Sequence, residues 1–297
     1  MKFFCIAVMV LSIYSCHPTR MAHTPVLKTT ADHGGVAMLL GVHPKRSLEQ
    51  APDSEWFNKN YAAYTVDSSI ANQLTPLLGD KRFEIFMGTW CGDSRREVPR
   101  MFKLLEYAGV KPSQITMIAV SNLDSSYKQS PGHEEKGKNI FRVPDLIVYA
   151  GDQELNRIVE SPLVSLEKDL LAIVSGKQYR PHYEGGLYLS KVMQLRTAAE
   201  LEKDSAAIVQ QLKTITAHSS ELNSLGHVWL AASDTSKALL AFRLNAMLFP
   251  GNASVYESLG AISIKMGQKQ KAKQYYQKAL EVEPVNQNAA KMLQQLK

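Results

Sequence analysis

Cysteine is scarce in this chain: Cys5, Cys16 and Cys91 are the three among 297 residues. A fold stapled by disulfides needs several paired cysteines at regular spacings, so that class of protein is excluded. The eight histidines include no pair at the spacing of metal ligands. No glycine pattern for a phosphate loop or a dinucleotide is present either. We therefore expect no metal site and no cofactor.

Concentrated charge is also absent. The formal net charge is +6, but the basic residues are spread along the chain and interleaved with acidic ones. A nucleic-acid-binding protein would gather them on one face beside aromatic or base-reading side chains. We expect no nucleic-acid partner and interpret the charge as a solvated surface with a weak bias toward anionic membranes.

The apolar run of residues 3–13 is too short to cross a bilayer. With Lys2 before it, the run is typical of a secretory signal peptide, which we place at residues 1–15. The following Ile-Tyr-Ser-Cys16 resembles the lipobox of bacterial lipoproteins. The resemblance implies lipidation of Cys16 and a membrane anchor in the cell envelope, with the protein facing the periplasm. The alternative is a plain cleaved signal with an incidental cysteine.

One thiol remains if Cys5 leaves with the signal and Cys16 carries the lipid. The cell envelope is an oxidising compartment, where paired cysteines form disulfides. Cys91 then has no partner within its own chain. It is either buried and inert, or functional.

The first half of the chain predicts an α/β domain at residues 51–177, preceded by a tether at residues 16–50 that is rich in Pro, His, Gly and Thr. Apolar runs and helical periodicity alternate there. We expect strands near residues 82–88, 115–120, 143–149 and 155–160, and helices near 67–79, 92–108, 134–139 and 165–174. This alternation predicts a layered α/β architecture.

The second half predicts helices alone: a helical connector at residues 178–218, then two repeats and a capping helix at residues 219–297. Placing residues 219–252 over 253–286 aligns small residues, aromatic residues and prolines at a period of 34. The aligned pairs are Leu225 with Leu259, Gly226 with Gly260, Ala238 with Ala272, Phe242 with Tyr276, and Pro250 with Pro284. This pattern resembles the tetratricopeptide repeat, which implies a protein or peptide partner in the groove of an all-α domain.

The motif Trp90-Cys91-Gly92-x-Ser94 follows a predicted strand and opens a predicted helix that contains Pro99. Together with the later Val-Pro144 pair, it resembles the thioredoxin superfamily over residues 65–176. The resemblance implies a thioredoxin-like fold, with Trp90 and Cys91 in the active-site turn and a cis peptide bond before Pro144 that brings this proline to the thiol.

A cysteine at the first turn of a helix lies where backbone N–H groups and the helix dipole stabilise a thiolate. We expect Arg95 or Arg96 to add to this effect where the side chain points back toward the sulfur, and Asp93 to oppose it. Asp145, directly after the proline, places another negative group near the substrate groove. Ser94 occupies the position of the family's second cysteine, so an internal disulfide cannot form. We expect its hydroxyl to donate a hydrogen bond to the Cys91 sulfur.

Two functions are consistent with these residues. In the first, Cys91 carries out monothiol exchange or another redox step with an external thiol, and the repeats recruit a protein partner. In the second, the chain is a non-catalytic scaffold with a thioredoxin fold, and Cys91 is incidental. A peroxidase role needs Arg and Thr or Ser arranged around the thiol, and the motif after Cys91 does not resemble that family.

Overall fold

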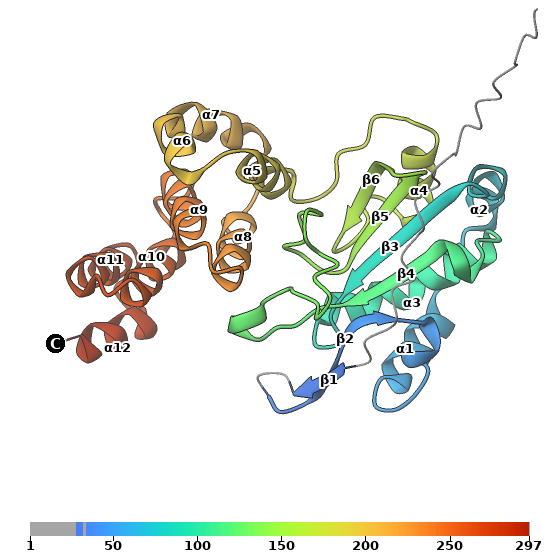
Figure 1. Cartoon of the computed structure of the whole chain (residues 1–297), viewed down its shortest axis with the longest axis horizontal. Coiled ribbons are helices and arrows are strands. Elements are labelled where there is room, and N and C mark those ends of the chain that lie inside the picture. The colour runs from blue at the N-terminus through green and yellow to red at the C-terminus, as the bar shows by residue number, and fades with distance from the viewer. Residues whose placement is uncertain (1–27, 32–33, 297) are drawn as a thin grey trace, which may run out of the picture.

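The computed structural model describes residues 28–31 and 34–296, and it has an α/β region followed by a helical region (Figure 1). The α/β region is built on a mixed sheet in the order β1-β2-β4-β3-β5-β6. Strands β3 and β4 are parallel, and the other neighbours are antiparallel. The strand bounds are β1 Lys28–Ala31, β2 Ala37–His43, β3 Lys81–Met87, β4 Ile115–Ala119, β5 Asp145–Ala150 and β6 Gln153–Val159.

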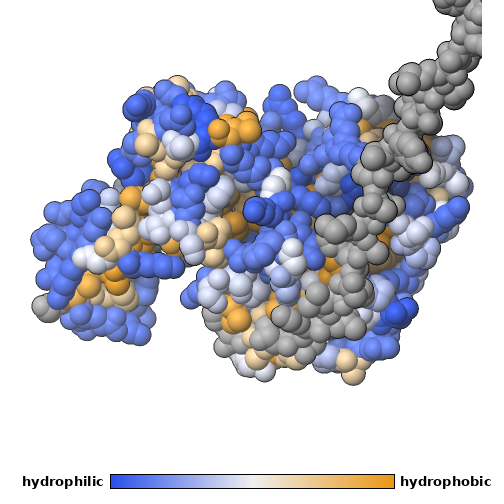
Figure 2. All heavy atoms as spheres, in the orientation of Figure 1, coloured by the Kyte–Doolittle hydropathy of each residue, from blue (hydrophilic) through white to orange (hydrophobic). Residues whose placement is uncertain are grey.

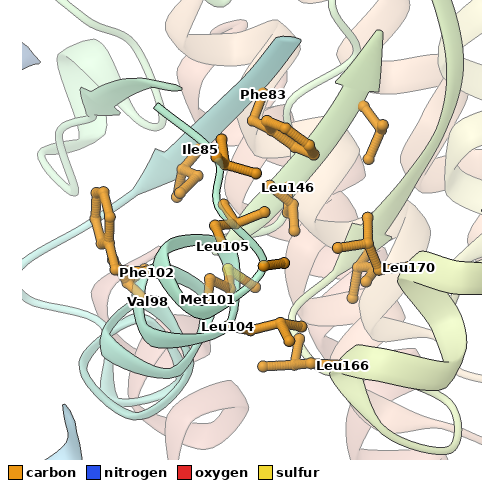
Figure 3. Packing of buried hydrophobic residues seen from close by; sticks show 14 of the residues in the cluster. Phe83, Ile85, Val98, Met101, Phe102, Leu104, Leu105, Leu146, Leu166 and Leu170 are labelled. Carbon is orange, nitrogen blue, oxygen red and sulfur yellow. The ribbon is translucent and has the colours of Figure 1, made fainter. Parts of the chain in front are cut away.

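Four helices contribute to the core on one face of this sheet. They are α1 (Ser54–Ala63), α2 (Ser68–Leu74), α3 (Gly92–Tyr107) and α4 (Leu166–Val174). Because side chains alternate along a strand, Phe83 and Ile85 of β3 point into this core. Figure 3 shows them packed against Leu105 of α3, with Leu170 of α4 nearby. The predicted layered α/β architecture is confirmed.

An irregular segment, residues 121–143, covers the opposite face of the sheet. Its Ile140 and Val143 pack against Phe86 of β3 and Ile147 of β5. The predicted helix at residues 134–139 is wrong, since these residues form turns. Glycine at 137 has a φ of +80°, a conformation that interrupts a right-handed helix.

The predicted tether at residues 16–50 is wrong within the described residues, where β1 pairs with β2. Residues 37–43 form β2, which pairs with β4, and Met38 and His43 are buried. The residues of this strand are a short apolar run between Gly34-Gly35 and Pro44, which is a local signal for a strand that the tether prediction missed. Pairing with β4 and burial of Met38 and His43 then hold the strand in place.

The prediction of helices alone in the second half of the chain is confirmed, since no strand follows β6 in the described residues up to 296. Figure 1 shows these helices to one side of the α/β region. They are α5 Glu184–Leu195, α6 Ala198–Lys203, α7 Ser205–Ile215, α8 Ser220–Ala231, α9 Thr235–Leu248, α10 Ala253–Lys265, α11 Lys269–Val282 and α12 Gln287–Gln295.

The 34-residue period corresponds to two packed helix pairs, α8 with α9 and α10 with α11. A Cβ atom added to Gly226 would lie 2.4 Å from the ring of Phe242, and one added to Gly260 would lie 2.7 Å from the ring of Tyr276. The glycines therefore let an aromatic ring of the second helix lie against the backbone of the first. The same contact recurs in both pairs, as the aligned sequence predicts.

The two regions meet through the end of the irregular segment. Phe141 belongs to a buried cluster formed mainly by the helical region, and a Cβ atom on Gly186 of α5 would lie 2.5 Å from its ring. The Arg142 guanidinium donates to the Ser220 carbonyl at the start of α8, at 2.8 Å. The helical region thus lies against the same segment that covers the sheet.

Candidate functional site

Cys91 is the N-cap residue of α3 and is partly buried. Its N–H donates to the Gly88 carbonyl at 2.9 Å, and its own carbonyl accepts from the Arg95 N–H at 3.0 Å. The Cys91 thiol lies 3.3 Å from the Val143 carbonyl, to which it donates, and the peptide bond from Val143 to Pro144 is cis. The turn and the proline that the sequence singled out therefore come together at the thiol.

Trp90 anchors the turn from β3 into α3. Its Nε1 donates to the Val120 carbonyl at the end of β4, at 2.8 Å. A Cβ atom on Gly88 would lie 2.4 Å from its indole ring. The ring thus occupies the space that a side chain at residue 88 would fill, so this turn requires glycine at that position.

Ser94 is fully buried in the first turns of α3. Its hydroxyl oxygen accepts from the Gly88 N–H at 3.2 Å. This bond ties the helix to the end of β3. Donation from the Ser94 hydroxyl to the sulfur stays a prediction.

The charged residues after Cys91 interact away from the sulfur. Asp93 pairs with Arg96 at 2.7 Å on the exposed surface of α3. The Arg95 side chain donates to the Thr89 carbonyl. Burial raises the pKa of Asp53, and the charge of Arg95 opposes that rise. Arg95 therefore links α3 to the start of α1. These interactions do not involve the Cys91 sulfur, so support of a thiolate by Arg95 stays a prediction. Gly92 is exposed, with open space where a Cβ atom would lie.

The expectation that Asp145 adds negative charge at the site is wrong. Asp145 is 1% exposed and pairs with Arg157 of β6 at 2.8 Å. Burial raises the pKa of Asp145 to about 6, against the opposing charge of Arg157. It is paired across the sheet with Phe86 of β3, so the two side chains lie on the same face, where Arg157 neutralises the Asp145 charge.

Lys128 is the site residue that the sequence did not reveal. It lies in the irregular segment and is 4% exposed. Its ammonium nitrogen lies 4.9 Å from the ring centroid of Trp90 and 4.8 Å from that of Tyr127. Burial lowers the pKa of Lys128 to about 8, and the nearby Cys91 charge acts in the opposite direction. A single lysine in a polar loop gives no sequence signal, because its proximity to Cys91 depends on the tertiary fold.

Groups from the helical region border the same site. Tyr127 stacks edge-on against His227 of α8, with centroids 6.1 Å apart, and hydrogen-bonds Ser224. Arg142 pairs with Glu160 at 3.0 Å, and the Tyr183 hydroxyl donates to the same carboxylate. The thiol therefore lies close to the junction of the two regions.

Residues 253–286 match the tetratricopeptide repeat family. These residues are α10 and α11, the second of the two helix pairs. The repeat supports binding of a protein partner. A comparison with curated proteins finds no match.

The surface and the remaining predicted sites add little further chemistry. Cys16 lies outside the described residues. Within the part of the chain that the structure describes, no group of three or more His, Cys, Asp or Glu side chains is arranged to hold a metal ion, and no helix is long and apolar enough to cross a membrane. Figure 2 shows hydrophilic residues over most of the visible face of both regions.

Proposed function

We propose that this chain is an envelope protein with a thioredoxin-like domain that carries out monothiol exchange at Cys91 and binds a protein partner through its repeats. The observation that carries the proposal is the position of Cys91 at the N-terminus of α3, with its sulfur 3.3 Å from the carbonyl that precedes cis-Pro144. Strand, turn, helix and cis-proline are combined here as in the thioredoxin superfamily. Cys91 is partly buried and not fully enclosed, so the proposal takes its thiol as accessible to a small disulfide.

The exchange proceeds in two balanced steps. The Cys91 thiolate attacks one sulfur of a disulfide R–S–S–R′, so that a Cys91–S–S–R bond forms and R′–S⁻ leaves with the electron pair and takes up a proton. The thiolate of an external thiol, R″–S⁻, then attacks the R sulfur of the Cys91–S–S–R disulfide, so that R″–S–S–R forms and Cys91 leaves with the electron pair and takes up a proton. No second cysteine of the chain is needed, which agrees with Ser94 in the position of the resolving residue.

The test uses oxidised glutathione as the small disulfide and the full-length chain. Trypsin releases Cys91 in the peptide of residues 83–95, whose mass reports the mixed disulfide. We expect rapid modification of this peptide in the native chain and its reversal by a free thiol, and Cys91→Ser supplies the blank. A peptide that stays unmodified under conditions that modify the unfolded chain would refute the exchange function.

A non-catalytic scaffold is the second candidate, and one observation favours it. The Cys91 thiol donates to a backbone carbonyl, a bond that only the neutral thiol makes. In this case the repeats perform the whole function, and Cys91→Ser binds the protein partner as well as the original chain does.

The envelope location and the lipid anchor are part of the proposal and rest on the pattern of residues 1–16. Two or more acyl chains are needed for stable residence in a membrane, because one chain binds only marginally. Mass analysis of the mature N-terminus tests this point: we expect an acylated Cys16 as the first residue. An unmodified N-terminus, or one that is not cleaved, would refute the lipid anchor.

A further inference from the structure

Lys128 is a buried cation without a partner of opposite charge. Among the side-chain hydrogen bonds and ion pairs of residues 34–296, none involves its ammonium group; the residue is 4% exposed, and the nitrogen is not one of the fully buried atoms that lack a partner. The rings of Trp90 and Tyr127 lie 4.9 and 4.8 Å from the nitrogen. Cation–π contacts offset only part of the loss of hydration of an ammonium group. A cation with so little contact with water is stabilised by a negative charge close to it.

The backbone holds Lys128 at this place. Its N–H donates to the Ser121 carbonyl at 2.8 Å, and the Ser121 N–H donates to the Gln129 carbonyl at 2.9 Å. The hydroxyl groups of Ser126 and Ser121 are 2.9 Å apart within the same loop. Lys128 itself has a φ of +56°, a left-handed conformation that L residues rarely adopt. The loop thus closes on itself with its lysine against the ring of Trp90, the neighbour of Cys91 in the sequence.

The charges around Lys128 leave Cys91 as the available counter-charge. The other two charges that act on the lysine are those of Arg142 and Glu160, which have opposite signs and pair with each other at 3.0 Å. Their effects therefore largely cancel. Asp93 is likewise paired, with Arg96. What remains is the sulfur, which is neutral as a thiol and negative as a thiolate.

Neutral and titratable groups complete the surroundings. Tyr183 donates to Glu160, and Tyr127 hydrogen-bonds Ser224. Burial raises the pKa of both phenols, so both are uncharged at neutral pH. Burial lowers the pKa of His227, which leaves its ring neutral beside Tyr127. None of these groups supplies a negative charge near Lys128 at neutral pH.

We propose that the Lys128 ammonium is the charge partner of the Cys91 thiolate, held in place by a loop that Tyr127 anchors on helix α8. Lys128 acts through the charge on the sulfur and is a positioning residue rather than a group that reacts. The inference rests on the proposed function in taking Cys91 as the reacting thiol, but it concerns formation of the thiolate and not the exchange that follows. It also implies that helix α8, the first helix of the repeats, contributes to the reactivity of the thiol.

The experiment measures the rate of Cys91 alkylation by iodoacetamide against pH in the native full-length chain, read from the peptide of residues 83–95. We expect Lys128→Met to move the rate profile to higher pH and to slow alkylation at pH 7 about tenfold, because a cation beside a thiolate commonly changes its protonation by a factor of this size. Lys128→Arg keeps the charge and should keep most of the rate. Lys136→Met, an exposed lysine of the same segment, is the matched control and should leave the profile unchanged.

A Lys128→Met profile that superimposes on the original, in a protein with an unchanged circular dichroism spectrum, would overturn the inference. If that variant does not fold, the reciprocal measurement replaces it, since coupling between two titrating groups must be mutual. The Lys128 side chain, followed by NMR of its Cε, should lose its proton at lower pH in Cys91→Ser than in the original chain. Equal titration in both proteins would be the contrary result.

The outcomes also separate this inference from the proposed function. If the alkylation profile depends on Lys128 but oxidised glutathione never modifies Cys91, the exchange function fails and the charge pair stands. If glutathione modifies Cys91 equally fast with and without the lysine charge, the exchange function stands and the charge pair fails.

Discussion

Replacing Lys128 by Met should stabilise the folded protein at neutral pH, because it removes a buried charge while keeping a flexible side chain of similar length. Burial lowers the pKa of Lys128 from 10.5 to about 8. Each pH unit between the two values corresponds to 1.36 kcal/mol, so protonating the folded state at pH 7 is disfavoured by about 3 kcal/mol relative to the unfolded chain. The cation–π contacts with Trp90 and Tyr127 return about 0.5–2 kcal/mol. The net gain from Lys128→Met is therefore about 1–3 kcal/mol.

The sign of the pH dependence is fixed by the lowered pKa. Between about pH 8 and 10.5 the unfolded chain binds more protons at this lysine than the folded chain does, so the penalty diminishes as the pH rises. It is fully present below about pH 8, and by pH 9.5 it falls to about 1.5 kcal/mol. The advantage of Lys128→Met should diminish with it.

The assay is urea unfolding of the full-length chain at pH 7 and pH 9.5, followed by tryptophan fluorescence and circular dichroism. The Cys91→Ser background removes the thiolate, so that the lysine is measured alone, and Lys136→Met again serves as the control. If Lys128→Met is less stable than its parent at pH 7, or if its advantage grows toward pH 9.5, the desolvation argument for this lysine is refuted.

Two further predictions concern the cores of the two regions, and both are read by urea unfolding. Arg157→Met should lower the free energy of unfolding by about 3–5 kcal/mol, because it leaves the Asp145 carboxylate buried without its cation. Asp145→Asn should lower it clearly less, because Arg157 keeps its bonds to Glu154 at 2.8 Å. Equal losses of stability in the two variants would contradict this asymmetry. Gly226→Ala should lower the free energy of unfolding by about 1–3 kcal/mol, because the new methyl group would lie 2.4 Å from an aromatic ring. Gly251→Ala is the control, because a Cβ atom there would lie in open space. Equal stability of the two variants would refute the packing argument.

Local signals in the sequence predicted the parts of the structure that depend on neighbouring residues. The turn at Cys91, the helix that follows it and the periodic helix pairs each have a short pattern of apolar, small and aromatic residues. The contact of Gly226 with Phe242 was predictable because both residues recur after 34 positions. Such patterns survive because packing within one supersecondary unit imposes them.

The remaining features depend on contacts between distant segments. Strand β2 is an exception, because its apolar run between glycines and a proline is a local strand signal, and its pairing with β4 agrees with that signal. Asp145 next to Pro144 looks like a site residue until its pairing with Arg157, 12 residues away, is known. Lys128 lies 37 residues after Cys91 in a polar loop, and no periodicity joins them. The correction at Asp145 and the new site residue Lys128 thus share one cause, which is contact between distant segments that no local pattern signals.

The most direct test of the account compares the reactivity of Cys91 in the native and the unfolded chain. Both forms of the full-length protein are mixed with oxidised glutathione at pH 7, one in buffer and one in urea, and the peptide of residues 83–95 is followed by mass spectrometry. If the helix N-terminus and Lys128 stabilise a thiolate, native Cys91 reacts faster than the same cysteine in the unfolded chain. Equal or slower reaction of the native protein would contradict the account and leave the repeats as its functional part.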